Sequence, residues 1–186
     1  MTPQKKAQHW LKSNFLILDT ETTGLGDDAE IVEISIIDCQ GEVLVNTLVK
    51  PSRPIPAEAT AIHGITDEMV AGAPTWCFTL IHMVAPAIAG REVVIYNADY
   101  DVRLLNQSCT MNRLPIPQLG IKAHCAMLAY AEFYGQKSDR GGYKWQKLTA
   151  AAEQQGVTSE GVAHRALADC LTTLSVIHAM AEGGAA

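Results

Sequence analysis

The eleven residues Phe15–Leu25 read FLILDTETTGL. Phe15–Leu18 is a continuous apolar run, which is typical of a strand buried on both faces of a sheet. Asp19 and Glu21 follow directly, and residues i and i+2 of a strand point to the same side about 6.5–7 Å apart. Two carboxylates at that separation repel each other by about 2–3 kcal/mol at an effective dielectric constant near 20. The stretch therefore predicts a buried strand that ends in an unexplained pair of acids.

The composition is that of an ordinary globular protein. The chain has 186 residues, of which 48% are hydrophobic and 18% are charged, and this length suits one domain. No apolar run is long enough to cross a bilayer, and the first residues lack the apolar core of a signal peptide, so we expect a cytoplasmic protein without a membrane partner. Five widely spaced cysteines without a Cys-x-x-Cys pair argue against a disulfide framework and a zinc knuckle. Nothing in the sequence indicates the oligomeric state.

The charge is unevenly distributed. The net charge of −6 argues against an indiscriminate nucleic-acid binder, because such proteins are usually basic. Residues 136–147 nevertheless carry four basic residues and one acid, namely Lys137, Arg140, Lys144, Lys147 and Asp139. The remaining chain is correspondingly more acidic, and bound cations would neutralise part of that acidity.

The order of the predicted elements indicates an α/β domain with a mixed sheet. Residues 30–39 and 43–50 form a hairpin of two strands after the first strand. Residues 51–74 are rich in Pro and Gly and predict a loop with short helical turns, and residues 75–89 predict a helix that Pro86 ends or bends. Further strands are expected at 92–96 and 121–124, with helices at 98–109, 125–134, 144–155 and 165–180.

A third acid stands near the start of the helix that begins NADYDVRLL. Asn97 is a good N-cap, and the helix dipole explains Asp99 in the first turn. Asp101 lies on the same helical face as Leu104 and Leu105 and therefore points toward the core, where a charge needs a partner. A capping or partly solvated acid remains the alternative for Asp101.

The last predicted helix, in HRALADCLTTLSVIHAM, is apolar on two sides and carries Asp169 near its start. His164 lies five residues earlier, about 140° away if both were helical, so we expect His164 in the loop before the helix. A single histidine in a loop is most often only solvated. Four acids and a histidine nevertheless suit Mg²⁺ or Mn²⁺, and two such ions about 3.5–4 Å apart are a recurring solution for phosphodiester hydrolysis. Histidine suits the general base that this chemistry needs near neutral pH.

The motifs together resemble one family. DTETTG at 19–24, NADYD at 97–101 and HRALAD at 164–169 are similar to the three motifs of the DEDDh 3′-to-5′ exonucleases, the DnaQ-like and exonuclease X-like group. AIHGITDEMVAGAP at 61–74 also resembles the stretch between the first two motifs. The similarity extends from Phe15 to about Met180.

The resemblance implies a ribonuclease H-like α/β fold. Its mixed five-stranded sheet has three antiparallel strands first and then parallel strands, and helices flank it. We expect an exonuclease domain at 15–181, an N-terminal extension at 1–14 and a flexible tail at 182–186. Trp10 and Leu11 in the extension pack either on the domain or on a partner.

The resemblance also implies the roles of single residues. The metal ligands would be Asp19, Glu21, Asp101 and Asp169, which hold two divalent cations, Mg²⁺ or Mn²⁺, and His164 would be the general base. The residues that seat the last nucleotides would be Thr22, Glu58, His63, Asn97 and Tyr100. Hydrolysis of the terminal phosphodiester would release nucleoside 5′-monophosphates from 3′ ends of DNA.

The sequence departs from the family pattern at several places, one of which is the conservative change to Tyr100 where relatives usually have Phe. Tyr96 stands where relatives commonly have His, and Ala126 stands where they have Thr. We therefore interpret His124 and Cys125, which precede Ala126, as packing residues and not as ligands.

Residues 135–147, GQKSDRGGYKWQK, combine basic and aromatic residues. These residues could guide a single strand of nucleic acid, with Tyr143 or Trp145 stacking on bases. The alternative is a solvated loop before an amphipathic helix. We favour a core position for Trp145 and leave open whether the charges touch substrate. With so small a basic patch, we expect weak, salt-sensitive binding and a distributive enzyme unless a partner tethers it.

Other functions remain as alternatives. The chain could be an exoribonuclease that trims RNA 3′ ends, since no contact to a ribose 2′-hydroxyl can be identified; the HGIT segment and the exonuclease X-like relatives favour DNA. A non-catalytic nucleic-acid or protein-binding module on the same fold is disfavoured, because all four acids and the histidine are present. Proofreading within a polymerase is disfavoured, because no tether follows the last predicted helix.

Overall fold

A five-stranded mixed sheet forms the centre of the protein. The computed structural model describes residues 1–114, 121–158 and 164–184. The sheet has the order β3-β2-β1-β4-β5, in which β1–β2 and β2–β3 pair antiparallel and β1–β4 and β4–β5 pair parallel. The strands are β1 (Leu16–Thr22), β2 (Ile31–Ile37), β3 (Val43–Leu48), β4 (Val93–Ile95) and β5 (Ala123–Cys125). The predicted fold class is confirmed.

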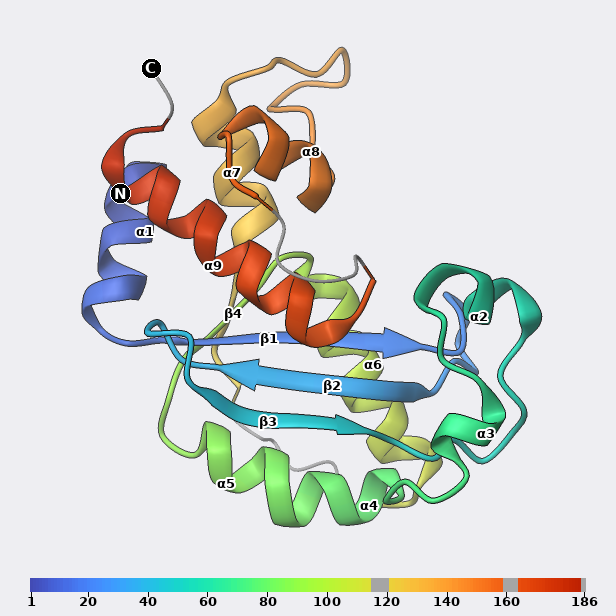
Figure 1. Ribbon diagram of the computed structural model, residues 1–186. Coiled ribbons are helices and arrows are strands. Elements are labelled where there is room, and N and C mark those ends of the chain that lie inside the picture. The colour runs from blue at the N-terminus through green and yellow to red at the C-terminus, as the bar shows by residue number, and fades with distance from the viewer. Residues whose placement is uncertain (115–120, 159–163, 185–186) are drawn as a thin grey trace.

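Helices cover both faces of this sheet (Figure 1). On one face lie α1 (Pro3–Lys12), α7 (Ala126–Tyr134), α8 (Leu148–Gln154) and α9 (Ala166–Glu182). The other face is covered by α4 (Trp76–Thr79), the π-helical turn η1 (Leu80–Val84), α5 (Ala85–Ile88) and α6 (Ala98–Met111). The short helices α2 (Ala57–His63) and α3 (Asp67–Val70) lie beyond the end of β1. No helix in these described ranges is long and apolar enough to span a membrane.

Strand β1 contributes side chains to two separate cores. Ile17 packs with residues of α1, α7 and α9, whereas Leu16 and Leu18 pack with residues of α4 and α6. Because side chains alternate along a strand, Asp19 and Glu21 lie on the same face as Ile17, toward α9. Both are partly exposed, whereas Leu16–Leu18 are buried. The apolar half of β1 therefore fixes the strand, and its second half presents two acids at the end of the sheet.

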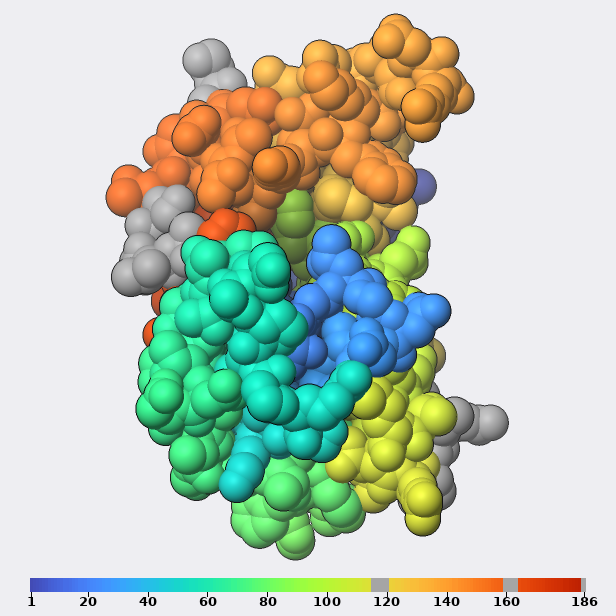
Figure 2. All heavy atoms as spheres, turned by 90° about the vertical axis from the view of Figure 1, so that its right-hand side faces the viewer, coloured from blue at the N-terminus to red at the C-terminus, as the bar shows by residue number. Residues whose placement is uncertain are grey.

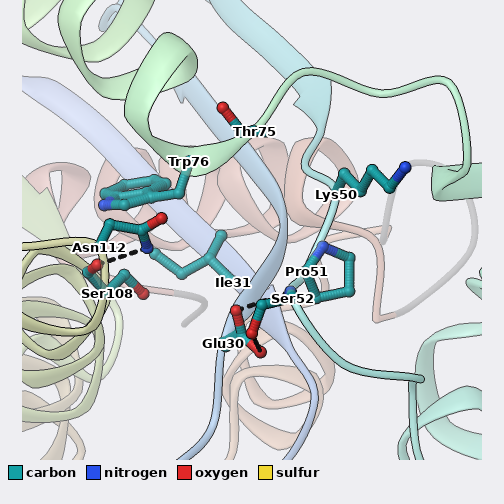
Figure 3. A pocket seen from close by; sticks show the side chains of 9 residues that line it. All are labelled: Glu30, Ile31, Lys50, Pro51, Ser52, Thr75, Trp76, Ser108 and Asn112. Atoms are coloured by element: carbon teal, nitrogen blue, oxygen red, sulfur yellow. Dashed lines mark hydrogen bonds between the residues drawn. The ribbon is translucent and has the colours of Figure 1, made fainter.

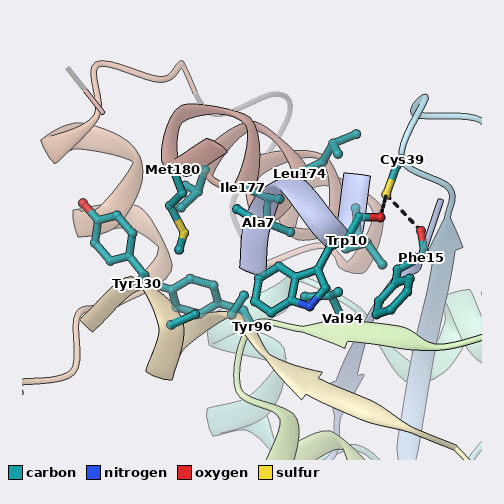
Figure 4. Packing of buried hydrophobic residues seen from close by; sticks show 14 of the residues in the cluster. Ala7, Trp10, Phe15, Cys39, Val94, Tyr96, Tyr130, Leu174, Ile177 and Met180 are labelled. Atoms are coloured by element: carbon teal, nitrogen blue, oxygen red, sulfur yellow. Dashed lines mark hydrogen bonds between the residues drawn. The ribbon is translucent and has the colours of Figure 1, made fainter. Parts of the chain in front are cut away.

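Helix α1 belongs to the packed body of the protein. Trp10 is 3% exposed and packs in the same core as Tyr96, Tyr130 and Met180 (Figure 4). The Cys39 thiol donates to the carbonyl oxygens of Trp10 and Phe15, at 3.6 and 3.0 Å. The structure thus places Trp10 on the domain itself.

Two predicted helices differ in detail. The helix expected at 75–89 continues past Pro86 to Ile88, and the π-helical turn ends at Val84, two residues before that proline. Proline lacks an N–H and crowds the carbonyl four residues earlier, so a widened turn accommodates it. The helix expected from residue 144 begins only at Leu148, because Lys144 is hydrogen-bonded to Gln136 in a hairpin. Of the predicted tail, residues 185–186 lie outside the described residues.

Replacement of Trp10 by Ala tests how far α1 stabilises the body. We expect the free energy of unfolding to fall by about 3–5 kcal/mol, the usual cost of truncating a buried aromatic side chain. Urea unfolding followed by circular dichroism measures this. Lys5→Ala on the exposed side of the same helix should change stability by less than about 0.5 kcal/mol. Equal effects of the two substitutions would contradict a stabilising role for Trp10.

Candidate active site

The acids of β1 meet a third acid from α6 at the end of the sheet. Asp101 is 4% exposed, and its carboxylate accepts a hydrogen bond of 2.7 Å from the Thr20 hydroxyl. Thr20 lies between Asp19 and Glu21, so Asp101 reaches the strand at the level of both acids. The inward direction expected for Asp101 is found. Asp99, two residues earlier, is exposed.

Helix α9 brings the fourth acid and the histidine. Glu21, His164 and Asp169 each offer a ligand atom within 4.8 Å of the others. His164 lies just before α9, as expected, and has the left-handed backbone conformation, with φ 61°. Burial raises the pKa of the Asp169 carboxyl, while the electrostatic interaction with His164 and a hydrogen bond from the His164 backbone partly lower it. The left-handed turn at His164 therefore lies close enough to α9 for its backbone to form a hydrogen bond with the Asp169 carboxyl.

The acidic cluster is electrostatically unfavourable in the absence of cations. Burial and then repulsion from Asp101, Asp169 and Glu21 raise the pKa of Asp19 well above its usual value. Burial, followed by repulsion from Asp169, raises the pKa of Glu21 to about 8. Burial raises the pKa of Asp101 to about 7. Within the described residues, none of the four acids forms an ion pair with a basic side chain.

This donor set fits divalent cations of the hard type. Such ions prefer carboxylate oxygens, and their charge would remove the repulsion that raises these pKa values. A cluster of acids without basic partners is otherwise hard to explain on a strand that is so well packed.

A fifth acid, which sequence analysis did not single out, supports the cluster from β2. Glu33 pairs with Glu21 across the β1–β2 ladder and is 3% exposed. Its carboxylate accepts hydrogen bonds from the Arg165 guanidinium at 2.6 and 3.1 Å and from the backbone N–H of Ala166 at 2.9 Å. Glu33 therefore fixes the first turn of α9 and the residue that follows His164. The inward position of an acid in the apolar strand IVEISII was the available signal.

Four of the five residues expected to seat the substrate line one hollow of about 510 Å³: Thr22, Glu58, His63 and Tyr100. The hydroxyls of Thr22 and Tyr100 lie 2.7 Å apart, and both donate to the Gly24 carbonyl oxygen at 2.9 Å. His63 is buried, with Nδ1 accepting from the Ile65 N–H and Nε2 within 3.3 Å of the Thr22 carbonyl oxygen. These contacts attach α2 and α6 to the end of β1 and shape the walls of the hollow.

Asn97, the fifth of these residues, is exposed at the start of α6. It occupies the N-cap position but makes no capping hydrogen bond with its side chain, contrary to the capping role considered for it. Figure 2 shows the face of the molecule on which β1 ends, with the segments after β1 and around α2 bordering a recess.

A second hollow of about 300 Å³ lies between Trp76 of α4, Ser108 of α6 and the segment Lys50–Ser52 (Figure 3). None of the four acids lines it. Glu30, at its edge, accepts hydrogen bonds from the backbone and the hydroxyl of Ser52, both at 2.9 Å. The acidic cluster, and not this cavity, therefore holds the groups suited to catalysis.

Two interpretations of individual side chains have clear outcomes. His124 pairs with Glu92 at 2.7 Å, and its ring lies against those of Trp10 and Phe15, in agreement with a packing role. The core position favoured for Trp145 is wrong, because its side chain is 66% exposed. The helix expected to bury it begins after Trp145.

The profile of the RNase T family, described as Exonuclease, matches residues 16–177. The chain belongs to this exonuclease family. It is 54% identical over 190 residues to the uncharacterized exonuclease CP81 of Escherichia phage 186, an alignment that covers all of this chain and 97% of the phage protein. It is 37% identical to exodeoxyribonuclease 10 of Escherichia coli K12, over 87% of this chain and 66% of that protein.

Solved structures agree with this family assignment. Exonuclease X in complex with 5′-overhanging duplex DNA is 30% identical, with a TM-score of 0.64 and 90% coverage of each chain. The nuclease domain of 3′hExo, a DEDDh family member bound to rAMP, has a TM-score of 0.76 at 20% identity, over 92% of this chain and 94% of that one. The exonuclease thus has the ribonuclease H-like fold of these nucleases.

The raised pKa values predict how stability of the metal-free exonuclease depends on pH. Glu21 and Asp101 have pKa values of about 8 and 7 in the folded protein, compared with about 4 in an unfolded chain. The folded state therefore binds more protons between about pH 4 and 8, and the free energy of unfolding falls as pH rises through this range. In EDTA, the midpoint temperature of thermal unfolding should decrease as the pH is raised from about 5.5 to 8. Addition of Mg²⁺ or Mn²⁺ should raise this midpoint more at pH 8 than at pH 5.5.

Asp101→Asn should flatten this pH dependence, because it removes one of the titrating groups. Asp99→Asn is the matched control on the same helix and should leave it unchanged, since Asp99 is exposed. A metal-free midpoint that rises toward pH 8 would contradict the described electrostatics.

Glu33→Gln tests the contact between β2 and the start of α9. The substitution removes the negative charge to which both Arg165 and the Ala166 N–H donate hydrogen bonds. We therefore expect the free energy of unfolding to fall by about 2–3 kcal/mol. Urea unfolding near pH 6 measures this loss. At that pH the neighbouring acids Glu21 and Asp101 are largely protonated, so relief of their repulsion with Glu33 does not mask the effect. Glu42→Gln, at an exposed position, should stay within about 0.5 kcal/mol of the parent, and a similar result for Glu33 would refute the anchoring role.

Proposed function

We propose that this exonuclease removes nucleoside 5′-monophosphates from the 3′ ends of DNA by metal-dependent hydrolysis. The observation that carries the proposal is the meeting of Glu21, His164 and Asp169, whose ligand atoms lie within 4.8 Å of one another, with Asp19 close enough to be repelled by Glu21, Asp101 and Asp169. The acids come from the first strand and from two helices distant in sequence. The motif residues predicted to act together therefore lie together at one end of the sheet.

The proposed roles follow from the chemistry of each group. Asp19, Glu21, Asp101 and Asp169 would hold two divalent cations, Mg²⁺ or Mn²⁺, which when bound supply an acidified water and stabilise the leaving oxygen. His164 is exposed beside Asp169, so a ring nitrogen can accept the proton of the attacking water and release it to solvent. The hollow lined by Thr22, Glu58 and Tyr100 would receive the terminal nucleotide.

The relatives support DNA as the substrate and its 3′ end as the place where hydrolysis begins. Exodeoxyribonuclease 10 is named for DNA, and a DNA polymerase III subunit epsilon from Treponema pallidum is 32% identical over 91% of this chain and 80% of that protein. Exonuclease X was solved with duplex DNA that has a 5′ overhang, which leaves a recessed 3′ end. Release from the 3′ end follows from the resemblance of the three motifs to the DEDDh pattern.

End-labelled strands test the direction of digestion and the substrate. Single-stranded DNA, duplex DNA and RNA labelled at either end are incubated with the exonuclease and Mg²⁺ or with EDTA. We expect a 3′ label to appear at once as mononucleotide and a 5′ label to remain on a ladder of shortened strands, with DNA degraded faster than RNA. Immediate release of a 5′-terminal mononucleotide would refute the proposed direction, and faster loss of RNA would favour the exoribonuclease.

Substitutions in the cluster assign the roles within the same assay. Asp19→Ala should abolish release, whereas His164→Ala should lower the rate by about 10²–10⁴-fold, the usual contribution of a general base. Asp99→Asn should retain parent activity. An Asp19→Ala protein that is folded and active would exclude the two-cation site, and an unchanged pH–rate profile for His164→Ala would exclude His164 as the base.

A further inference from the structure

The segment 136–147, here called the basic hairpin, connects α7 to α8 and is ordered by its own hydrogen bonds. The Lys144 N–H donates to the Gln136 carbonyl at 2.8 Å, and Lys137 and Tyr143 form an antiparallel bridge. Gly141 and Gly142 close the tip with φ values of 88° and 73°, which glycine adopts without steric cost. The segment therefore has a defined shape of its own.

A buried amide fixes the base of the basic hairpin. Gln146 is 8% exposed, and its side-chain N–H groups donate to the Gln136 side chain at 3.1 Å and to the Lys144 carbonyl at 3.0 Å. Its amide oxygen accepts from the Gln154 side chain of α8 at 3.1 Å. The side chain of Gln146 thus connects both arms of the hairpin to the helix that follows.

The hydroxyl of Tyr96 links this base to the end of the sheet. It donates to the Gln146 carbonyl oxygen at 3.0 Å, and Tyr96 directly follows β4. In the parallel pairing of β1 with β4, Ile17 lies opposite Val94, so Asp19 and Tyr96 each lie two residues beyond that pair. The anchor of the basic hairpin is therefore at the same level of the sheet as the first acid of the cluster.

Trp145 is held outward by this arrangement. It directly precedes the inward-facing Gln146 and is 66% exposed, whereas the chain's other two tryptophans, Trp10 and Trp76, are 3% and 4% exposed. Burial of its indole would be favourable, so a fixed backbone that exposes the ring is characteristic of a binding surface.

The charges around Trp145 are unpaired cations. Lys137, Arg140, Lys144 and Lys147 are all exposed, and none forms an ion pair with any residue that the structure describes. The Lys137 ammonium lies 4.0 Å from the centre of the Tyr143 ring. In a protein of net charge −6, this surface is complementary to a polyanion. Figure 2 shows this segment at the upper right of the face on which β1 ends.

We propose that the basic hairpin is a second binding site for the substrate, at which Trp145 stacks on an unpaired base while Lys144 and Lys147 contact phosphates. This inference rests on the proposed function and extends it, because stacking on a base face requires a single-stranded segment. Tyr96, which stands where relatives commonly have His, then acts as a positioning residue that fixes the hairpin relative to the acids. The strand would be held at its end by the acidic cluster and upstream by the hairpin.

The fluorescence of Trp145 tests binding without hydrolysis. The full-length protein is titrated in EDTA with oligothymidylate of about 20 nucleotides, and a fluorescein-labelled oligonucleotide reports binding independently by anisotropy. We expect quenching of the exposed tryptophan, and Trp145→Ala should weaken binding by about 5- to 150-fold, the range for loss of one stacked base. The double variant Lys144→Gln/Lys147→Gln should reduce the slope of log K against log salt by about 1.4, or 0.7 for each lost phosphate contact.

Phe78→Ala is the matched control, since Phe78 of α4 is also an exposed aromatic, at 52%, and lies on the opposite side of the sheet. It should leave binding and hydrolysis unchanged. In the hydrolysis assay, Trp145→Ala should lower kcat/KM for the long strand more than for a trinucleotide. Unchanged Trp145 fluorescence at saturating oligonucleotide, or an unchanged ratio of the two kcat/KM values, would overturn the second site while leaving the proposed hydrolysis intact. Absence of hydrolysis with retained quenching would overturn the proposed function alone.

Discussion

Repulsion among carboxylates at the end of β1 is the constraint on which the rest of the structure depends. Burial raises the pKa values of Asp19, Glu21, Asp101 and Asp169, and repulsion within the cluster raises those of Asp19 and Glu21 further. No basic side chain in the described part of the chain forms an ion pair with any of the four. At an ordinary strand end the carboxylates would turn toward the solvent, which would weaken their repulsion. Here the strand is buried between two apolar cores, so the acids stay close together and remain available for cations.

The contacts that oppose this repulsion lie just outside the cluster. The charge of Glu33 itself adds to the repulsion, but its hydrogen bonds to Arg165 and to the Ala166 N–H hold the start of α9 in place. Thr20 donates a hydrogen bond to Asp101 and thereby favours its charged form. Thr20 lies between Asp19 and Glu21 in β1, and Glu33 lies opposite Glu21 in β2, so this pair of strands supplies two of the four acids and both supporting side chains.

Much of the site follows from local sequence patterns, and the exceptions are long-range. Helical periodicity was enough to predict that Asp101 points inward, because the leucines three and four residues later define the buried face. The role of Glu33 was missed, since its partner Arg165 is 132 residues away and no local pattern connects them. Trp145 was misplaced because a helical pattern was extended through it, whereas the buried Gln146 next to it keeps the segment extended. Tertiary hydrogen bonds override local propensity at such positions.

The site also joins the two ends of the chain. Asp19 belongs to the first strand and Asp169 to the last helix, and α1 packs on that same helix, with the side chains of Gln4 and Gln8 donating to the Ala181 carbonyl oxygen. Contacts between residues so far apart in sequence carry a loop-closure cost, which slows folding. A chain emerging from the ribosome cannot complete the acidic cluster until α9 has been synthesised. The architecture therefore leaves the acidic cluster incomplete until the chain has been synthesised through Asp169.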